Sequence, residues 1–464
     1  MIQKNDIVCA VAEGIGSNGE GIFRLEGMTF FVPYCLPGEK VRFKVLKTKD
    51  KIGYGKAEEV LTPAEERVRA KCPVFTRCGG CQLQHIEYKK QLLLKSKVVT
   101  DAFRKIAGIE ISVPKTHSSE KPFGYRNKLQ LPIGVDKDGN TVVGFYAERS
   151  HRIVPIEECA IHPAWSKDLI GCLNRYIKEC AVKGYDEERG VGQLRHIVVR
   201  DMGGQFIVTL VATTEKLPNL SFFIELLSGI FKDFTLWLNV NDKHTNVIFG
   251  EKFTLIHGKG FYEAKEKGVR YQAGPQTFVQ INADVRGKLY DAALKTVTGD
   301  GDEVVIDAYS GGGLLTAMIA KNAKRVYGIE IEKEAVECAD RLKEKNGLDN
   351  MTNICGAVED KIFAILEKEK DEKLRLILDP PRAGIHRTVV FALKESGIPK
   401  LTLISCNPAT LARDVGLLTG NLVEKDGELI KGDGNGEYEI ERVEPYDMFP
   451  QTKHVETLIC LTRK

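Results

Sequence analysis

A cysteine stands where an α/β protein places its chemistry. Cys406 follows the apolar run Leu401–Ile404, which predicts a buried strand. Asn407 and Pro408 come next and predict a helix that has Asn407 as its N-cap. The positive end of a helix dipole lowers the pKa of a thiol and favours the nucleophilic thiolate. Cys406 is therefore a candidate nucleophile, and the competing interpretation is a small core residue.

A glycine turn upstream predicts a nucleoside site. The predicted strand Val304–Ala308 runs through Tyr309 into Ser310–Gly313, and a second strand, Arg325–Glu330, ends in a carboxylate about 20 residues later, the spacing at which an acid holds ribose hydroxyls. The sequence has neither a GxGxxG turn nor a P-loop, so no pyrophosphate site is indicated. An adenosine ligand without phosphates is S-adenosylmethionine. Residues from about 270 onward thus predict a Rossmann-like methyltransferase sheet, with half of a nicotinamide-binding domain as the alternative.

Two carboxylates add to this constellation. The predicted strand Leu374–Leu378 leads into Asp379-Pro380-Pro381-Arg382, a motif that by itself also allows methylation of an exocyclic amine. A cysteine beside a methyl donor indicates another reaction, because the C5 carbon of a pyrimidine becomes nucleophilic only after a thiolate adds at C6. A base must then remove the C5 proton. Glu456 opens an apolar strand, and His454 is expected to share a strand face with it. The Glu456 carboxylate is therefore expected to be desolvated and basic. The alternative is a solvated residue near the chain end.

Four ordered motifs carry a specific resemblance. Ser405-Cys406-Asn407-Pro408, Asp379–Arg382, the spaced residues Phe278, Gln280 and Asn282, and His454-Val455-Glu456 are similar to those of the RNA uracil-C5 methyltransferase family. The resemblance implies that Cys406 is the nucleophile and Glu456 the proton acceptor. It also implies that the residues that bind S-adenosylmethionine are Gln280, Tyr309, Glu330 and Asp379. Orienting roles outside this core site are considered for Arg382, Asn407, Arg413 and His454.

A cysteine triplet predicts a metal site. Cys72, Cys78 and Cys81 lie in one glycine-containing segment, and the polar N-terminus shows no secretory signal, so a reducing cytoplasmic location is expected and disulfides are not. A triplet with one remote partner fits an iron-sulfur cluster better than zinc, which stays the alternative. By sequence the remote partner is one of Cys159, Cys172 and Cys180. The family resemblance implies Cys159 and a 4Fe-4S cluster.

The chain divides into three predicted parts. In residues 1–62, apolar and polar residues alternate as in the strands of a small antiparallel barrel, and basic residues form a strip. This region resembles the TRAM domain, an OB-like RNA-binding module. Residues 63–265 hold the cysteine segment and a β-rich central RNA-binding domain, and residues 266–464 form the methyltransferase domain. The helical stretch 88–106 either belongs to the central domain or packs against the catalytic domain. The predicted fold class is α/β.

Composition agrees with this plan. The chain has 464 residues, 43% of them hydrophobic, and no apolar run long enough to span a membrane. A net charge of +3 does not by itself indicate nucleic-acid binding. The resulting prediction is methylation of uridine C5 in RNA, with 23S ribosomal RNA as the substrate, no membrane and no obligate protein partner. The alternatives are a tRNA uracil-C5 methyltransferase, an RNA base N-methyltransferase and a non-catalytic RNA-binding factor.

Overall fold

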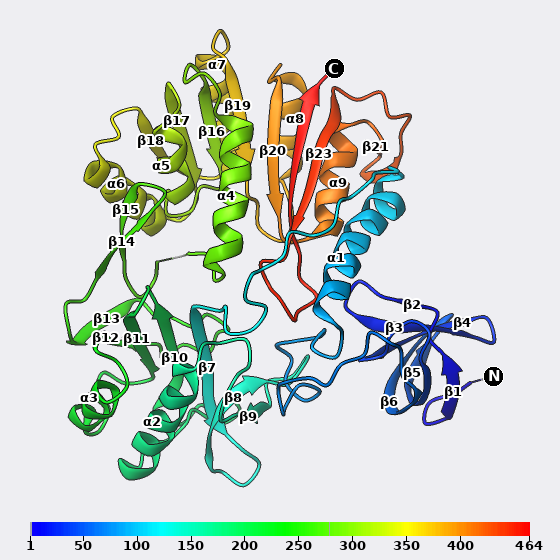
Figure 1. The fold of residues 1–464 in the computed structure, drawn as a ribbon. Coiled ribbons are helices and arrows are strands. Elements are labelled where there is room, and N and C mark those ends of the chain that lie inside the picture. Colours follow the sequence, from blue (N-terminus) through cyan, green and yellow to red (C-terminus); the bar gives the residue numbers. More distant parts are fainter. Residues whose placement is uncertain (1, 278) are drawn as a thin grey trace.

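Three sheets organise the chain. The computed structural model describes residues 2–277 and 279–464, and an N-terminal, a middle and a C-terminal sheet follow one another along the sequence (Figure 1). Each sheet buries apolar clusters of its own. The structure is therefore of the mixed α/β class that the sequence predicts.

The N-terminal sheet has the strand order β1-β5-β6-β4-β3-β2. Its strands are β1 (Ile7–Val11), β2 (Gly14–Ile15), β3 (Glu20–Leu25), β4 (Met28–Pro33), β5 (Lys40–Lys49) and β6 (Ile52–Thr62). Along β5, Val41, Phe43 and Val45 point into the core because alternate residues of a strand share a face. The prediction of a purely antiparallel barrel is wrong in one pair, since β4 and β6 run parallel. Strand β5 pairs with β1 and β6 instead, which leaves β6 as the neighbour of β4.

The middle sheet has the order β13-β12-β11-β10-β7-β8-β9. Its strands are β7 (Lys128–Val135), β8 (Thr141–Tyr146), β9 (Ile153–Pro155), β10 (Leu194–Asp201), β11 (Gln205–Ala212), β12 (Asp233–Val240) and β13 (Lys252–His257). Helices α2 (Trp165–Glu179) and α3 (Leu220–Ser228) pack on one face, where Leu129, Ile197 and Val208 belong to a single apolar cluster. The opposite face of β7 and β10 carries polar and charged residues.

The C-terminal sheet has the order β18-β17-β16-β19-β20-β24-β23. Its strands are β16 (Val304–Ala308), β17 (Arg325–Glu330), β18 (Met351–Cys355), β19 (Leu374–Leu378), β20 (Lys400–Ser405), β23 (Tyr438–Tyr446) and β24 (Glu456–Arg463). The first five are parallel, and β24 is antiparallel to β20 and β23. Two hairpins flank the sheet: β14 (Tyr262–Glu266) with β15 (Val269–Ala273), and β21 (Leu422–Lys425) with β22 (Glu428–Lys431).

Helices cover both faces of this sheet (Figure 1). One face packs against α4 (Ala283–Val297), α5 (Leu314–Ala320) and α6 (Lys333–Asn346). The other packs against α7 (Val358–Lys368), α8 (Arg387–Glu395) and α9 (Pro408–Leu418). Because both faces are buried, the strands are mostly apolar, as is usual for parallel sheets, with Asp307 in β16 and Thr402 in β20 as buried polar exceptions.

Helix α1 (Tyr88–Ala102) and the π-turn η1 (Phe103–Ala107) lie beside α9, far from their sequence neighbours in the middle sheet (Figure 1). Val99 and Phe103 are fully buried in the C-terminal core. Of the two placements that the sequence left open, the structure shows packing against the C-terminal sheet. Within the described residues, no helix combines the length and the apolar character needed to cross a membrane.

Candidate active site

The strand order brings the predicted residues to one edge. Parallel strands β16, β17, β19 and β20 all end at this edge, and the antiparallel β24 begins there. Ser405 pairs with Thr457, so Cys406 and Glu456 are the next residues of adjacent strands. Tyr309, Glu330 and Asp379 follow or end the neighbouring strands. Open α/β sheets bind their ligands at this edge, where the strand order reverses.

Cys406 lies between β20 and α9, as predicted. The helix begins at Pro408, and the Asn407 side chain accepts a hydrogen bond from the backbone N–H of Ala409 at 3.1 Å, which confirms the N-cap. The expected net lowering of the thiol pKa is wrong, however. Burial, and then the carboxylate of Glu456, raise the pKa of Cys406, while Arg382 lowers it only in part. Desolvation, followed by the neighbouring acid, thus holds the thiol pKa above its ordinary value.

Glu456 is the first residue of β24 and is only 2% exposed. Burial, reinforced by the charge of Asp379, raises its pKa well above the ordinary value, and Arg382 opposes the shift. The predicted desolvated, basic carboxylate is confirmed. The prediction that His454 shares a strand face with Glu456 is wrong, because β24 starts only at Glu456 and His454 lies in the preceding loop.

The glycine turn after β16 is tied to β17 through Glu330. One carboxylate oxygen of Glu330 accepts a hydrogen bond from the N–H of Gly311 at 2.9 Å, and the other accepts from the N–H of Glu332 at 2.9 Å. Tyr309 has a left-handed backbone with φ of 65°, a conformation that is costly outside glycine and is found most often at functional turns. The turn from Tyr309 to Gly312 is half-buried and lies at the edge of the sheet where β16 ends.

Asp379 and Gln280 complete the set of predicted methyl-donor positions. Asp379 directly follows β19, and burial raises the pKa of its carboxyl group to about 7. The backbone carbonyl of Gln280 accepts a hydrogen bond from Arg286 of α4 at 2.8 Å, which fixes the approach to that helix. Asn282 caps α4 by accepting from the N–H of Val285. Phe278, the first residue of this predicted motif, lies outside the described residues.

Asp307 is a further acid at this edge that the sequence reasoning missed. It is 2% exposed, and its carboxylate accepts a hydrogen bond from the hydroxyl of Thr316 at 2.6 Å. Burial, with smaller contributions from Asp379 and Glu330, raises its pKa to about 7. The available signal was a single carboxylate inside an otherwise apolar strand, a position that needs a specific partner.

Helix α9 holds the loop that follows Asp379. The Asn407 side chain donates to the carbonyl of Arg382 at 3.0 Å, and Arg413 donates to the carbonyl of Ala383 at 2.9 Å. Asp414 pairs with Arg413 and accepts from the N–H of Ile385 at 2.8 Å. These contacts keep Arg382 beside Cys406 and Glu456, whose pKa values both respond to its charge.

The cysteine segment forms a second candidate site. A cavity of about 480 Å³ is lined by all four predicted ligands, Cys72, Cys78, Cys81 and Cys159. Burial raises the pKa of Cys81 to about 12, and the neighbouring thiols Cys159 and Cys78 add to the shift. The rival cysteines lie elsewhere, since Cys172 is on α2 and Cys180 follows its last turn.

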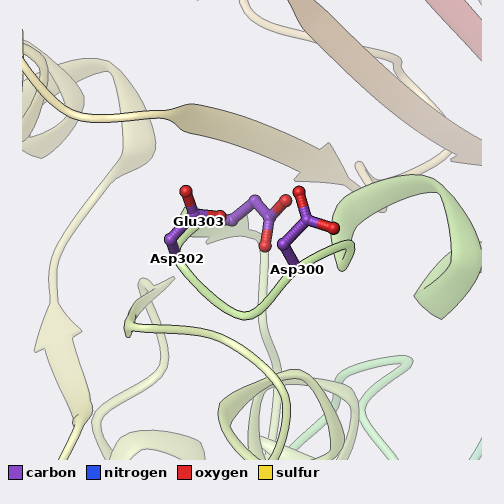
Figure 2. A group of neighbouring side chains, drawn as sticks. All are labelled: Asp300, Asp302 and Glu303. Carbon is purple, nitrogen blue, oxygen red and sulfur yellow. The ribbon is translucent and has the colours of Figure 1, made fainter.

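A group of three acidic side chains lies on the loop before β16. Among residues 2–277 and 279–464, it is the one set of at least three metal-ligating side chains whose ligand atoms all lie within 4.8 Å of one another. Figure 2 shows its members, Asp300, Asp302 and Glu303. The ammonium of Lys373 lies 2.9–3.2 Å from an oxygen of each, so one positive charge offsets part of the charge of the three carboxylates. Asp300 and Asp302 are exposed, and Glu303 is buried. The group is an ion-pair network before the start of β16, whereas the candidate active site lies where that strand ends.

Known proteins with similar sequence and fold agree with this geometry. Residues 259–464 match the model of the tRNA (uracil-5-)-methyltransferase family. An uncharacterized RNA methyltransferase of Clostridium acetobutylicum is 35% identical over 100% of this chain and 98% of its own length, and one of Halalkalibacterium halodurans is 35% identical over the same shares. The crystal structure of Pyrococcus abyssi tRNA (uracil-54, C5)-methyltransferase in complex with S-adenosyl-L-homocysteine covers 98% of this chain and 100% of its own, with a TM-score of 0.75 and 27% identity.

The fold and the edge site define an RNA methyltransferase. More specifically, the chain belongs to the RNA uracil-5-methyltransferase family.

Proposed function

We propose that this protein methylates C5 of a uridine in RNA, with S-adenosylmethionine as the methyl donor, through a covalent bond between Cys406 and C6. The observation that carries the proposal is the meeting of a thiol and a buried, basic carboxylate on adjacent strands β20 and β24, one residue beyond the Ser405–Thr457 pair. An amine methylase needs neither group, whereas C5 chemistry needs both.

The mechanism follows from this placement. The Cys406 thiolate adds to C6 of uracil, and the electron pair of the C5–C6 bond moves into an enolate. Gln280, Tyr309, Glu330 and Asp379 would hold S-adenosylmethionine, which would supply an electrophilic methyl group. C5 of the enolate takes this methyl group as the carbon–sulfur bond breaks and the sulfur leaves as a neutral thioether. Once C5 carries the methyl group, Glu456 takes the C5 proton. The electrons of that C–H bond re-form the C5–C6 double bond and expel the Cys406 thiolate.

Arg382 supports the first step. Because burial and Glu456 keep the pKa of the thiol high, a cation beside it is needed to favour the thiolate, and Arg382 is that cation. The same guanidinium stabilises the charged form of Glu456. The loop contacts from Asn407 and Arg413 therefore act through Arg382 as positioning contacts.

The cysteine cavity supports an iron-sulfur cluster bound by Cys72, Cys78, Cys81 and Cys159. A tight triplet of thiols with one remote partner, all lining one cavity, is the pattern of a 4Fe-4S cluster, whereas structural zinc sites usually pair two closely spaced cysteine knuckles. Such a group would crosslink the segment 72–81 to Cys159, and no electron is needed in the methylation steps.

The substrate proposed is 23S ribosomal RNA, with the N-terminal sheet acting as a TRAM-type RNA-binding module. Its strand β5 presents Lys40, Arg42 and Lys44 on the face opposite the core residues Val41 and Phe43. Transfer RNA is the second candidate, because the Pyrococcus abyssi protein of similar structure is a tRNA (uracil-54, C5)-methyltransferase.

The test is the 5-methyluridine content of separated ribosomal and transfer RNA from a deletion strain that carries the wild-type gene or Cys406→Ala. We expect a loss in ribosomal RNA that only the wild type restores. A loss confined to transfer RNA would keep the reaction and overturn the substrate. Unchanged 5-methyluridine in both, in a strain without a second such enzyme, would overturn the proposed function.

A further inference from the structure

Three cations lie close together on the middle sheet, on the face that α2 and α3 do not cover. Lys128 of β7 and Arg200 of β10 are direct partners across the antiparallel pair, so their side chains share a face. Arg126 lies two residues before Lys128. Arg200 is only 6% exposed, and the other two are partly buried. We name Arg126, Lys128 and Arg200 the cationic trio.

The trio has no carboxylate partner in the described parts of the chain. Among the described residues, no carboxylate acts on the charge of Lys128 or of Arg200, and the buried Nε atom of Arg200 has no hydrogen-bond partner. Burial, together with repulsion from Arg200 and Arg126, lowers the pKa of Lys128 to about 8. Like charges placed opposite each other on a sheet, and buried without partners, reduce stability. An anion bound from outside would relieve this repulsion.

The trio also lies at the join between the middle and C-terminal sheets. The N–H of Asn127, between Arg126 and Lys128, donates to the carbonyl of Ile281 at 3.1 Å, next to Gln280. On the other side, Tyr125 donates to the carbonyl of Pro450 at 3.0 Å, in the loop that leads to Glu456. The segment that carries Arg126 and Lys128 therefore contacts both the chain next to Gln280 and the loop before Glu456.

We propose that the cationic trio is a phosphate subsite that binds the phosphodiester groups flanking the target uridine. This inference rests on the proposed function, because a uridine can reach Cys406 only after leaving its stack, which brings its two neighbouring phosphates to the mouth of the site. Arginine forks match phosphate oxygens bidentately, and a partly desolvated lysine gains a strong charge-assisted hydrogen bond there. The trio thus sets the register of the RNA and leaves base recognition to the edge site.

The cysteine cavity is a second possible source of negative charge for these cations, and the experiment must distinguish it from RNA phosphate. Arg126 and Lys128 also line the cavity of the four cysteines, where thiolates would gather around a metal cluster. Arg200 is not among the residues that line this cavity. A counter-charge role for the cluster would therefore involve Arg126 and Lys128 without Arg200, whereas a phosphate subsite involves all three.

The experiment measures the salt dependence of RNA binding for the purified full-length protein and its variants Lys128→Met and Arg200→Met, with a ribosomal RNA fragment as the probe. We expect each variant to bind about tenfold more weakly and to lose about one unit of the slope of log K against log salt. Lys178→Met is the matched control, because Lys178 is exposed on α2 behind the other face of the sheet. Arg200→Lys keeps the charge and should keep the slope.

Stability and cluster content complete the test. Removing a cation from a repelling, unpartnered group should leave the melting temperature of the RNA-free variants equal to or above that of the wild type. Unchanged salt slopes would overturn the phosphate subsite, as would a loss of iron and of visible absorbance in Lys128→Met with RNA binding intact. The proposed function fails separately, if the wild type transfers no labelled methyl group to RNA.

Discussion

Glu456 and Cys406 show how two residues divide one reaction. Burial makes the Glu456 carboxylate basic, but the same low-polarity surroundings and the nearby acid hold the pKa of the Cys406 thiol up. Arg382 offsets both effects from a loop that α9 holds in place. The acid and the thiol are therefore tuned together, and separate substitutions should stop the reaction at different steps.

Glu456→Gln should trap the covalent intermediate. The amide still fills the site, so addition of Cys406 and methylation of C5 can occur, but no base removes the C5 proton, and turnover should fall by about 10²–10⁴-fold. A denaturing gel with labelled RNA should show a protein–RNA adduct that persists. Cys406→Ala is the control and should give no adduct. Wild-type turnover by Glu456→Gln would exclude this residue as the base.

Asp307 should make stability fall as pH rises. Its pKa is about 7 in the folded protein and about 3.9 in an unfolded chain, so between these values the folded state holds a proton that the unfolded state has released. The free energy of unfolding then decreases as pH rises from about 4 to about 7, by at most about 4 kcal/mol. Asp307→Asn keeps an acceptor for Thr316 and should remove this part of the decrease. Denaturant unfolding at pH 4.5 and pH 8 measures the difference, and equal pH dependence in both proteins would contradict the assignment.

At the scale of elements, α1 is fastened to the loop before β24 by a buried ion pair. The ammonium of Lys95 lies 2.5 Å from the carboxylate of Asp447 and donates to the carbonyl of Phe449 at 3.0 Å. Tyr88 donates to the other oxygen of Asp447 at 2.8 Å. Both charged side chains are almost fully buried, so each depends on the other for its stability in the core.

Lys95→Met should therefore destabilise the protein by about 3–5 kcal/mol, because it leaves Asp447 buried without its counter-ion. Lys95→Met combined with Asp447→Asn should recover part of that loss, since no charge is then stranded. Chemical denaturation of the three proteins gives the values. If the double variant is no more stable than Lys95→Met, the ion pair is not what fastens α1. Lys97→Met, which removes an exposed partner of Asp101 on the same helix, is the control and should cost less than about 1 kcal/mol.

At the scale of the molecule, the cysteine segment is connected to the loop between β23 and β24. The N–H groups of Gln82 and Leu83, directly after Cys81, donate to the carbonyl of Gln451 at 3.1 and 3.0 Å. The Gln82 side chain accepts from the N–H of Lys453 at 3.2 Å. Gln91 of α1 donates to the side chain of Gln451 at 3.0 Å. Any group that orders the segment 72–81 therefore also orders the chain that enters Glu456.

Removal of the proposed cluster should destabilise the cysteine segment and the loop before β24, while the sheets stay folded. Chelation of iron, or Cys81→Ser, is expected to raise amide hydrogen exchange in residues 72–83 and 447–455 while the strands around 304–308 stay protected. Exchange followed by mass spectrometry measures this order. Cys180→Ser is the matched control, because Cys180 lies outside the cavity. Uniform loss of protection across the C-terminal sheet would show that the segment is not a local unit.

The sequence by itself determined the local chemistry. The strand before Cys406, the cap at Asn407, the glycine turn, the acid at Glu330 and the cysteine triplet all depend on neighbours within a few residues, and the structure has the predicted strands and helix at these positions. Four family motifs in order then predicted the class of protein. Short-range patterns of polarity, capping and chain reversal are sufficient for such features.

Only the tertiary structure decided what these residues meet. Burial of Cys406, together with the antiparallel entry of β24 that places Glu456 beside it, raises the thiol pKa that the helix terminus was expected to lower. The packing of α1 against α9, the burial of Asp307 and the unpartnered trio on β7 and β10 likewise join segments that are distant in sequence. Burial and long-range charge are properties of the assembled neighbours, and no local pattern contains them.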